Sequence, residues 1–327
     1  MIFRLLHNNK AMHFIALPIL SVVLWLGALI HPVEHAFQLD VYHTMPLYQP
    51  FYLLSQWSST VGTILAMLLS IATAFLLTNL NSRFLFLEQK TFLPAYLYLI
   101  IIGGLTPLLY LSPVYLVNIF GIWSIIIVFD ADKTQSALSK IFNAGFIFGI
   151  GSLIYFNFIF LFPLLWIAFQ YIHKNIDWRI LVISLTGLLL PWLYVYTYYF
   201  FFDYPHLLFE IIQANFWTPE HHSNNFMMIY IIVLIALTLL SVTGLLRTLE
   251  QRGSTYRSFF RIFLCIGMMS ILVFFFVPSA SLEVIPMAMP PLAFILANYL
   301  IEMKRKFWVN ALLYALLAGV IYLQLAS

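Results

Sequence analysis

Long apolar stretches separated by short polar or charged segments make up nearly the whole chain. Residues 61–77 and 229–246, for example, are continuously apolar runs without a charged side chain. In hydrocarbon every backbone polar group needs a partner within the chain, so such runs form helices or a closed barrel. Barrel strands would be about ten residues long and would alternate strictly. The longer, non-alternating runs predict an all-α fold, a polytopic transmembrane helical bundle.

The apolar runs, bounded by charges or turn residues, predict about eleven membrane spans. They cover residues 13–30, 51–78, 92–111, 113–129, 141–155, 157–172, 180–202, 226–246, 262–277, 286–301 and 307–325. The region 141–172 is open to two interpretations, because its length suits either one long tilted helix or two short ones.

The distribution of basic residues favours two short crossings in region 141–172. Cytoplasmic loops carry an excess of lysine and arginine. With two crossings and a cytoplasmic N-terminus, all 15 lysines and arginines lie inside, whereas one crossing would export those from Lys174 to Lys306. Gly151, Ser152 and the segment 155–157 favour a turn at the outer interface. We therefore predict a hairpin there, with a cytoplasmic N-terminus and a periplasmic C-terminus.

The composition leaves no room for a water-soluble domain. Hydrophobic residues make up 63% of the chain and charged residues only 8%, against roughly 25% charged residues in soluble domains. The net charge of +3 is spread in small groups, which argues against nucleic acid as a partner. We expect residues 1–327 to form a single integral membrane domain whose partner is the lipid bilayer. The first apolar run lacks a small-residue cleavage site, so we interpret it as a retained span.

Two outer loops are long enough to have structure of their own, residues 31–50 and 203–225. In the second loop apolar residues recur at helical spacing from Leu207 to Phe216. This pattern predicts either an amphipathic helix in the membrane interface or an extension of the preceding span. Within the spans, Gly145 and Gly149 have the small-xxx-small spacing that lets two helices approach closely.

The same two loops carry the carboxylates and imidazoles that could support chemistry. Asp40, His43, Asp203 and His221 form a candidate set of ligands for a divalent metal ion. Glu34 or Asp40 is the candidate catalytic residue, as a general base beside an acceptor hydroxyl. The alternative is that these side chains are solvated loop ends. Cys265 is the only cysteine, so an intramolecular disulfide is excluded.

Several segments, in order along most of the chain, resemble one known family. They are residues 43–48, 90–98, 112–120, 142–156 and 177–179, the last followed by Gly187 and Pro191. These segments resemble an uncharacterised family of bacterial polytopic inner-membrane proteins that carries a domain-of-unknown-function label. The resemblance implies a multi-pass protein of the bacterial inner membrane.

The layout also resembles the GT-C class of membrane glycosyltransferases, which use polyprenyl-phosphate-linked sugars. The similar features are the acidic first outer loop, the hairpin at 141–172, and the Pro286–Pro291 segment that begins a late span. In that class a first-loop acidic residue acts as base or metal ligand, which implies Asp40, or else Glu34, for this role. Those enzymes also need a cation or metal to offset phosphate charge, and the predicted outer face has no lysine or arginine.

Three functions remain open from the sequence. The first is a glycosyltransferase-like protein acting on a polyprenyl-linked sugar at the periplasmic face. The second is a noncatalytic subunit or scaffold of a cell-envelope complex, with other membrane-protein subunits as partners. The third, a transporter, is less favoured because we find no repeat and the charges map to span ends.

Overall fold

The computed structural model describes residues 12–32, 41–131, 137–173, 178–217, 225–280, 282–303 and 305–326. These residues form α-helices and short 3-10 helices, and no strand occurs among them. The α-helices are α2 (His13–Ile30), α3 (Gln49–Trp57), α4 (Ser59–Phe84), α5 (Leu93–Gly103), α6 (Pro113–Ala131), α7 (Ala137–Ile154), α8 (Pro163–His173), α9 (Trp178–Phe201), α10 (Pro205–Trp217), α11 (Asn225–Leu249), α12 (Ser254–Phe276), α13 (Ile285–Glu302) and α14 (Lys306–Ala326). The 3-10 helices are η1 (Val41–His43), η2 (Thr106–Leu108), η3 (Phe156–Leu161) and η4 (Leu282–Val284).

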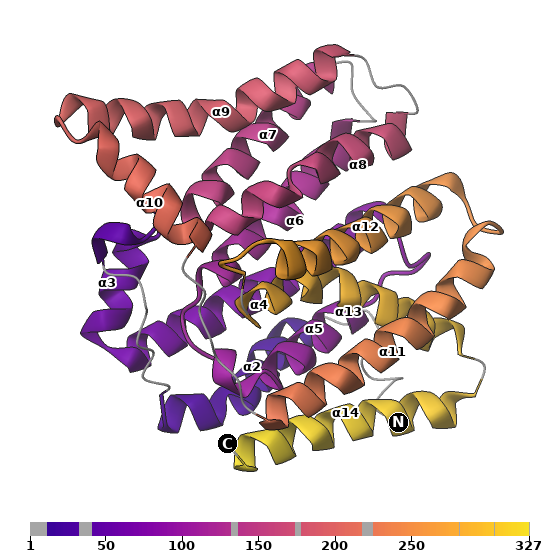
Figure 1. Cartoon of the computed structure of the whole chain (residues 1–327). Helices are drawn as coiled ribbons and strands as arrows, with labels where there is room; N and C mark the ends of the chain where they lie inside the picture. Colours follow the sequence, from indigo (N-terminus) through magenta and orange to yellow (C-terminus); the bar gives the residue numbers. More distant parts are fainter. Residues whose placement is uncertain are drawn as a thin grey trace.

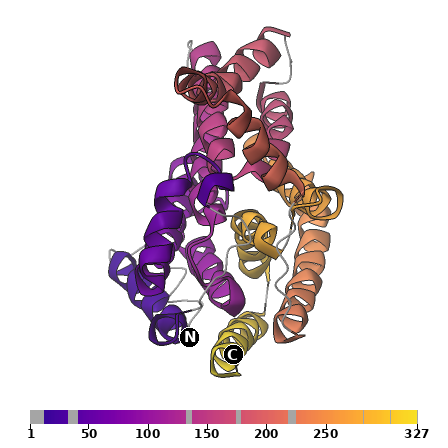
Figure 2. The same cartoon turned by 60° about the vertical axis from the view of Figure 1, so that its left-hand side comes forward.

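The all-helical character predicted from the apolar runs is confirmed among the described residues, and the apolar helices are compatible with a multi-pass membrane protein. Within the described residues, eight helical segments are long and apolar enough to cross a membrane. Three shorter apolar segments, Leu93–Gly103, Leu138–Ile154 and Phe156–Ile172, correspond to the remaining predicted spans. The bundle surrounds α5, which is buried along its whole length. In both views α9 and α14 lie at opposite edges of this bundle (Figures 1 and 2).

The predicted span at 51–78 begins and ends later than expected. Ser58 adopts an extended conformation and separates α3 from α4, and its hydroxyl accepts a hydrogen bond from the Val61 amide at 3.5 Å. A serine at this position caps a new helix rather than continuing the previous one. The crossing is therefore α4, which continues to Phe84, and α3 is a short separate helix at its outer end (Figure 1).

The chain reverses direction between α7 and α8, as the basic residues predicted. Tyr155 is extended and leads into η3. The start of α7 and the end of α8 lie at the same end of the bundle. There Lys140 Nζ donates to the Asp130 carbonyl at 3.0 Å, and Ser258 Oγ donates to the Tyr171 carbonyl at 2.9 Å.

This end of the bundle, which we call the basic end, gathers the last turns of α4, α6, α8, α11 and α13 and the first turns of α5, α7, α9, α12 and α14 (Figure 1). Every lysine and arginine among the described residues belongs to these helix ends or to the described residues that join them. Arg83, at the end of α4, pairs with Asp130, at the end of α6, at 2.6 Å. The described lysines and arginines are thus gathered at one end of the bundle, as the sequence predicts. The assignment of this end to the cytoplasm stays a prediction.

Close packing of α7 on α9 confirms the interpretation of Gly145 and Gly149. A Cβ atom on Gly145 would lie 2.3 Å from the Ser184 carbonyl oxygen, and one on Gly149 would lie 2.6 Å from that of Leu188. Gly187 on α9 has the reciprocal position, since a Cβ atom on it would lie 2.4 Å from the Phe142 carbonyl oxygen. Since these neighbours are backbone atoms, the two helices could not approach as closely with any larger residue.

Candidate functional site

The end of the bundle opposite the basic end, which we call the outer end, brings together the two long loops of the sequence prediction. Asn215 of α10 donates a hydrogen bond to the carbonyl oxygen of His43 in η1 at 2.7 Å. The amide of Ser279, between α12 and α13, donates to the Phe216 carbonyl at 3.1 Å. The described parts of loops 31–50 and 203–225 and of the α12–α13 connection therefore meet in one place, and α3 and α10 lie on the same side in Figure 1.

Helix α10 is the amphipathic helix that the apolar spacing of residues 207–216 predicts. Leu208 and Ile211 are buried against the bundle, while Phe209 and Glu210 are exposed. Trp217, at the end of the helix, is also exposed. The helix is thus separate from α9, and its location in the membrane interface stays a prediction.

Only two residues of the candidate metal and catalytic set lie in the described part of the chain. His43 is half-buried in η1, and Asp203 is exposed in the turn after α9, with a left-handed φ of 63°. Glu34, Asp40 and His221 lie outside the described residues. Among the described residues no group of three or more histidine, cysteine, aspartate or glutamate side chains is placed to hold a metal ion. The metal set and the base therefore stay predictions.

A break in the predicted span 92–111 lies at the centre of the outer half of the bundle. Helix α5 ends at Gly103, and residues 104–112 form a linker that contains η2 before α6 begins at Pro113. Pro107 has no amide hydrogen to donate to the Gly103 carbonyl, which disfavours continuation of the α-helix through this position. Sequence hydropathy alone did not reveal the break, because the linker is as apolar as the helix.

Carbonyl groups at and beside this break accept hydrogen bonds from side chains of three other helices and of the turn before α3. The bonds are Tyr230 Oη to Ile101 at 3.1 Å, Gln324 Nε2 to Gly103 at 3.2 Å, Tyr115 Oη to Leu108 at 3.0 Å and Tyr48 Oη to Leu111 at 2.7 Å. Irregular backbone at membrane depth is tolerated where protein groups satisfy it in this way. Broken helices of this kind often form substrate sites in membrane proteins.

A buried carboxylate lies against this linker. Glu283, in η4, is only 5% exposed, and its Oε1 accepts a hydrogen bond from the Tyr110 hydroxyl. An ionisable side chain buried in a membrane bundle is expensive to maintain and by default indicates a functional site. The sequence placed Glu283 at the outer face but did not single it out. The sequence feature that could have identified Glu283 is its position between an apolar run and the prolines that begin the next span.

An apolar cavity of about 60 Å³ lies between α6, α8, α12 and α13. Asn118 and Met287 line it, and Phe129, Leu165 and Ile262 form other parts of its wall. Ligand pockets for small molecules usually measure about 300–1,000 Å³. This cavity is therefore too small and too apolar to hold a sugar.

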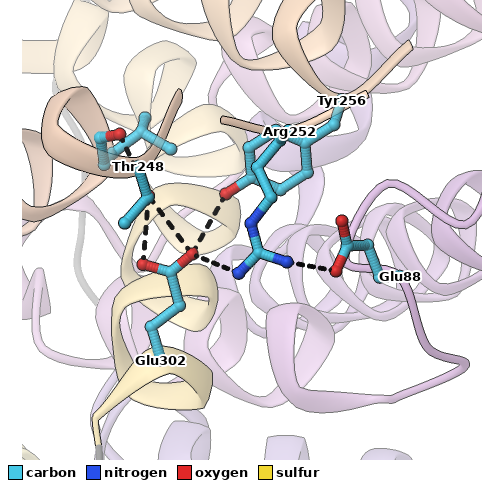
Figure 3. Close-up of polar contacts among 6 residues, drawn as sticks. Glu88, Thr248, Arg252, Tyr256 and Glu302 are labelled. Atoms are coloured by element: carbon cyan, nitrogen blue, oxygen red, sulfur yellow. Dashed lines mark hydrogen bonds and ion pairs between the residues drawn. The ribbon is translucent and has the colours of Figure 1, made fainter. Parts of the chain in front are cut away.

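The basic end contains a second polar cluster, drawn in Figure 3. Arg252 lies between two carboxylates, 2.5 Å from Glu88 and 3.2 Å from Glu302. Thr248 Oγ1 donates to Glu302 at 3.3 Å, and the Tyr256 hydroxyl lies 3.5 Å from it. The cluster ties the α4–α5 loop to the end of α13 through the α11–α12 loop.

In this cluster one guanidinium faces two carboxylates, and we call the cluster the clasp because it joins separate segments of the chain. Partial burial of the Arg252 guanidinium opposes its charge, but Glu88 and Glu302 more than offset this effect and raise its pKa. Nearby, Glu250 pairs with Arg261 and Arg257. The hydrogen bond from Arg261 and the charge of Arg257 lower the pKa of Glu250. These contacts favour the charged forms of Arg252 and Glu250, whose pKa values move away from neutral pH rather than toward it, as they would in a catalytic acid or base.

Comparison with known proteins adds no assignment to this geometry. No protein-family model matches the chain, and no curated protein matches its sequence.

Proposed function

We propose that this chain is a multi-pass protein of the bacterial inner membrane, with a layout like that of GT-C glycosyltransferases, which acts on a polyprenyl-linked sugar at its outer end. The observation that carries the proposal is the buried Glu283 beside the broken-helix linker, at the end where loops 31–50 and 203–225 meet. In this proposal Glu283, held by Tyr110, lies near the lipid headgroups of the outer leaflet.

The reaction that fits is sugar transfer to an acceptor hydroxyl. The bond between the anomeric carbon and the phosphate oxygen breaks, and a bond to the acceptor oxygen forms. Polyprenyl phosphate leaves with the electron pair, and the acceptor proton passes to a carboxylate acting as general base. We assign the base or metal-ligand role to Asp40 or Glu34. Glu283 and Tyr110 would support the site from the bundle.

The phosphate charge needs compensation, because no lysine or arginine lies at the outer end among the described residues. We propose that a divalent metal ion held by Asp40, His43, Asp203 and His221 supplies it. Transfer would then require the metal.

The test is sugar transfer from polyprenyl-linked donors by purified protein, with Mn²⁺ and with chelator. The Glu34→Ala/Asp40→Ala variant is expected to lose transfer, and Glu283→Gln to reduce it strongly. Glu250→Gln changes a carboxylate at the basic end and is the matched control, with activity retained. Absence of transfer by the wild-type protein would contradict the proposed activity, and full activity of the double variant would contradict the assigned roles.

A second function, a noncatalytic subunit of a cell-envelope membrane complex, is favoured by a different observation. The outer half of α9, the turn after it and α10 expose many large aromatic side chains, and the cavity described above is too small for a sugar. The exposed aromatic residues are Tyr194, Tyr196, Tyr198, Phe200, Phe201, Phe202, Tyr204, Phe209 and Trp217. Aromatic side chains of this kind can bind partner helices as well as lipid headgroups.

Gentle detergent extraction and affinity purification distinguish these functions. A noncatalytic subunit should be recovered with another membrane protein at a stoichiometric level. Recovery of a lone monomer that transfers sugar would support the enzyme and exclude the subunit.

A further inference from the structure

The apolar cavity between α6, α8, α12 and α13 has no part in the proposed function, and its cause lies in the local sequence. Gly121 and Ser124 on α6 and Ala168 on α8 line it, and these small side chains leave space between the helices. On α13 the cavity is lined by Pro290 and Pro291, which lack amide hydrogens and bend the helix that contains them. The cavity is therefore built into the packing of these helices.

The cavity is long and narrow. Its wall on α6 runs from Val117 to Phe129, and this stretch of α-helix extends about 18 Å. The volume of about 60 Å³ is thus spread over more than half of the hydrocarbon thickness of a bilayer, which is about 30 Å. Space of this shape suits a single extended chain rather than a ring or a compact polar molecule.

The polar side chains of the cavity wall are already bonded within the protein. Asn118 Nδ2 donates to the Pro286 carbonyl at 3.0 Å, and Ser124 Oγ donates to the Ala144 carbonyl at 3.4 Å. Among the described residues that line the cavity, none carries a charge. A polar ligand would lose its hydrogen bonds to water here and gain few in return, which is unfavourable. The class of ligand that fits is a hydrocarbon chain.

The cavity is partly open to its surroundings. Gly121 and Ile125 on α6 and Ile266 on α12 line it and are only half-buried. Both helices are long and apolar enough to cross a membrane, so the medium around them is expected to be the hydrocarbon of the bilayer. A lipid chain can therefore enter the cavity without leaving an apolar environment.

We propose that the cavity binds one acyl chain of a membrane phospholipid, which lies along α6, with α8 on one side and α12 and α13 on the other. An unbranched acyl chain suits the narrow shape, whereas the methyl branches of a polyprenyl chain need more width. Methylene groups in this space supply the dispersion contacts that the facing side chains would lack across a void. This lipid site is separate from the sugar site at the outer end and does not depend on the proposed activity.

The first test is photocrosslinking of the full-length protein in phosphatidylethanolamine vesicles that contain a phospholipid with a diazirine midway along one acyl chain. Adducts mapped by mass spectrometry are expected at Leu165 and Ile262, which are buried residues of the cavity wall. Ile232 on α11 is 62% exposed and reports labelling by bulk lipid. Labelling of Ile232 without labelling of the cavity wall would overturn the proposal. Displacement of the cavity adducts by polyprenyl phosphate but not by unlabelled phospholipid would also overturn it.

The second test fills the cavity with a side chain. A Cβ atom on Gly121 would lie 3.5 Å from the Phe158 ring, an ordinary contact, so Gly121→Leu is expected to occupy the cavity and to reduce the adducts at Leu165 several-fold. Gly319→Leu is the matched control, because a Cβ there meets nothing within 4 Å and Gly319 does not line the cavity. Equal labelling of Leu165 in the wild-type protein and in Gly121→Leu would contradict binding in the cavity.

Thermal stability provides a readout on the unaltered protein. In detergent depleted of lipid, added phosphatidylethanolamine should raise the thermal midpoint of the wild-type protein by about 2–4 °C, because a ligand that binds only the folded state stabilises it. The Gly319→Leu variant should respond equally, and Gly121→Leu should not respond. A wild-type midpoint that does not change with added phospholipid would overturn the proposal, whether or not Gly121→Leu folds.

Discussion

The side-chain amide of Asn118 donates a hydrogen bond to the main-chain carbonyl of Pro286 at 3.0 Å. This carbonyl would normally accept from the residue four positions later, but that residue is Pro290, which has no amide hydrogen. The asparagine on α6 thus replaces a bond that the sequence of α13 removes. Through this bond the proline-rich start of α13 is attached to α6, one helical turn from Glu283.

Removing this replacement should destabilise the bundle. We expect Asn118→Leu to lower the free energy of unfolding by about 1–3 kcal/mol, because the Pro286 carbonyl stays buried without a donor. Reversible unfolding in mixed micelles measures the change. In a Pro290→Ala background the residue-290 amide can bond Pro286, so the penalty should shrink. An equal penalty in both backgrounds would show that Asn118 acts through some other contact.

The α7–α9 contact should be intolerant of a single methyl group. Gly145→Ala places its Cβ against the Ser184 backbone, which cannot rotate away, and should cost about 1–3 kcal/mol of stability. Gly267→Ala and Gly319→Ala are matched controls, since a Cβ at either position meets nothing within 4 Å. Both should be neutral or slightly stabilising in the same unfolding assay. Equal effects at all three glycines would contradict the packing argument.

The clasp at the basic end should contribute little free energy. Arg252 and Glu88 are substantially exposed, with side-chain accessibilities of 35% and 52%, and exposed ion pairs are worth no more than about 1 kcal/mol. Arg252→Ala should therefore reduce stability by no more than about 1 kcal/mol, and the effect should weaken as salt is added. A loss several times larger that does not respond to salt would indicate a buried role for Arg252.

The orientation of the bundle can be tested with single cysteines in a Cys265→Ser background. A cysteine at Asp203, in the outer loop, should react with a membrane-impermeant maleimide in intact spheroplasts. A cysteine at Gln251, at the basic end, should react only after the membrane is permeabilised. The reverse pattern would invert the orientation and remove the basis for an outer active site.

Packing of α7 and α9 and the reversal at Tyr155 were predictable from the sequence because their signals are local. Two glycines four residues apart, or a change in basic residues across a candidate hairpin, can be recognised without knowing which helices are neighbours. The break in span 92–111 was harder to predict from the sequence, although Pro107 could have indicated it. The role of Glu283 was the hardest to predict, since its partner Tyr110 is 173 residues away along the chain.

The sequence by itself determined that this protein is an all-helical bundle of apolar helices and that its described basic residues gather at one end, because hydropathy and charge act on each segment independently of the others. Tertiary structure alone decided how the carbonyls of the broken helix are satisfied, that Tyr110 meets Glu283, and that Asn118 compensates Pro290. Each of these contacts joins distant segments, so it exists only once the helices have packed in one particular arrangement.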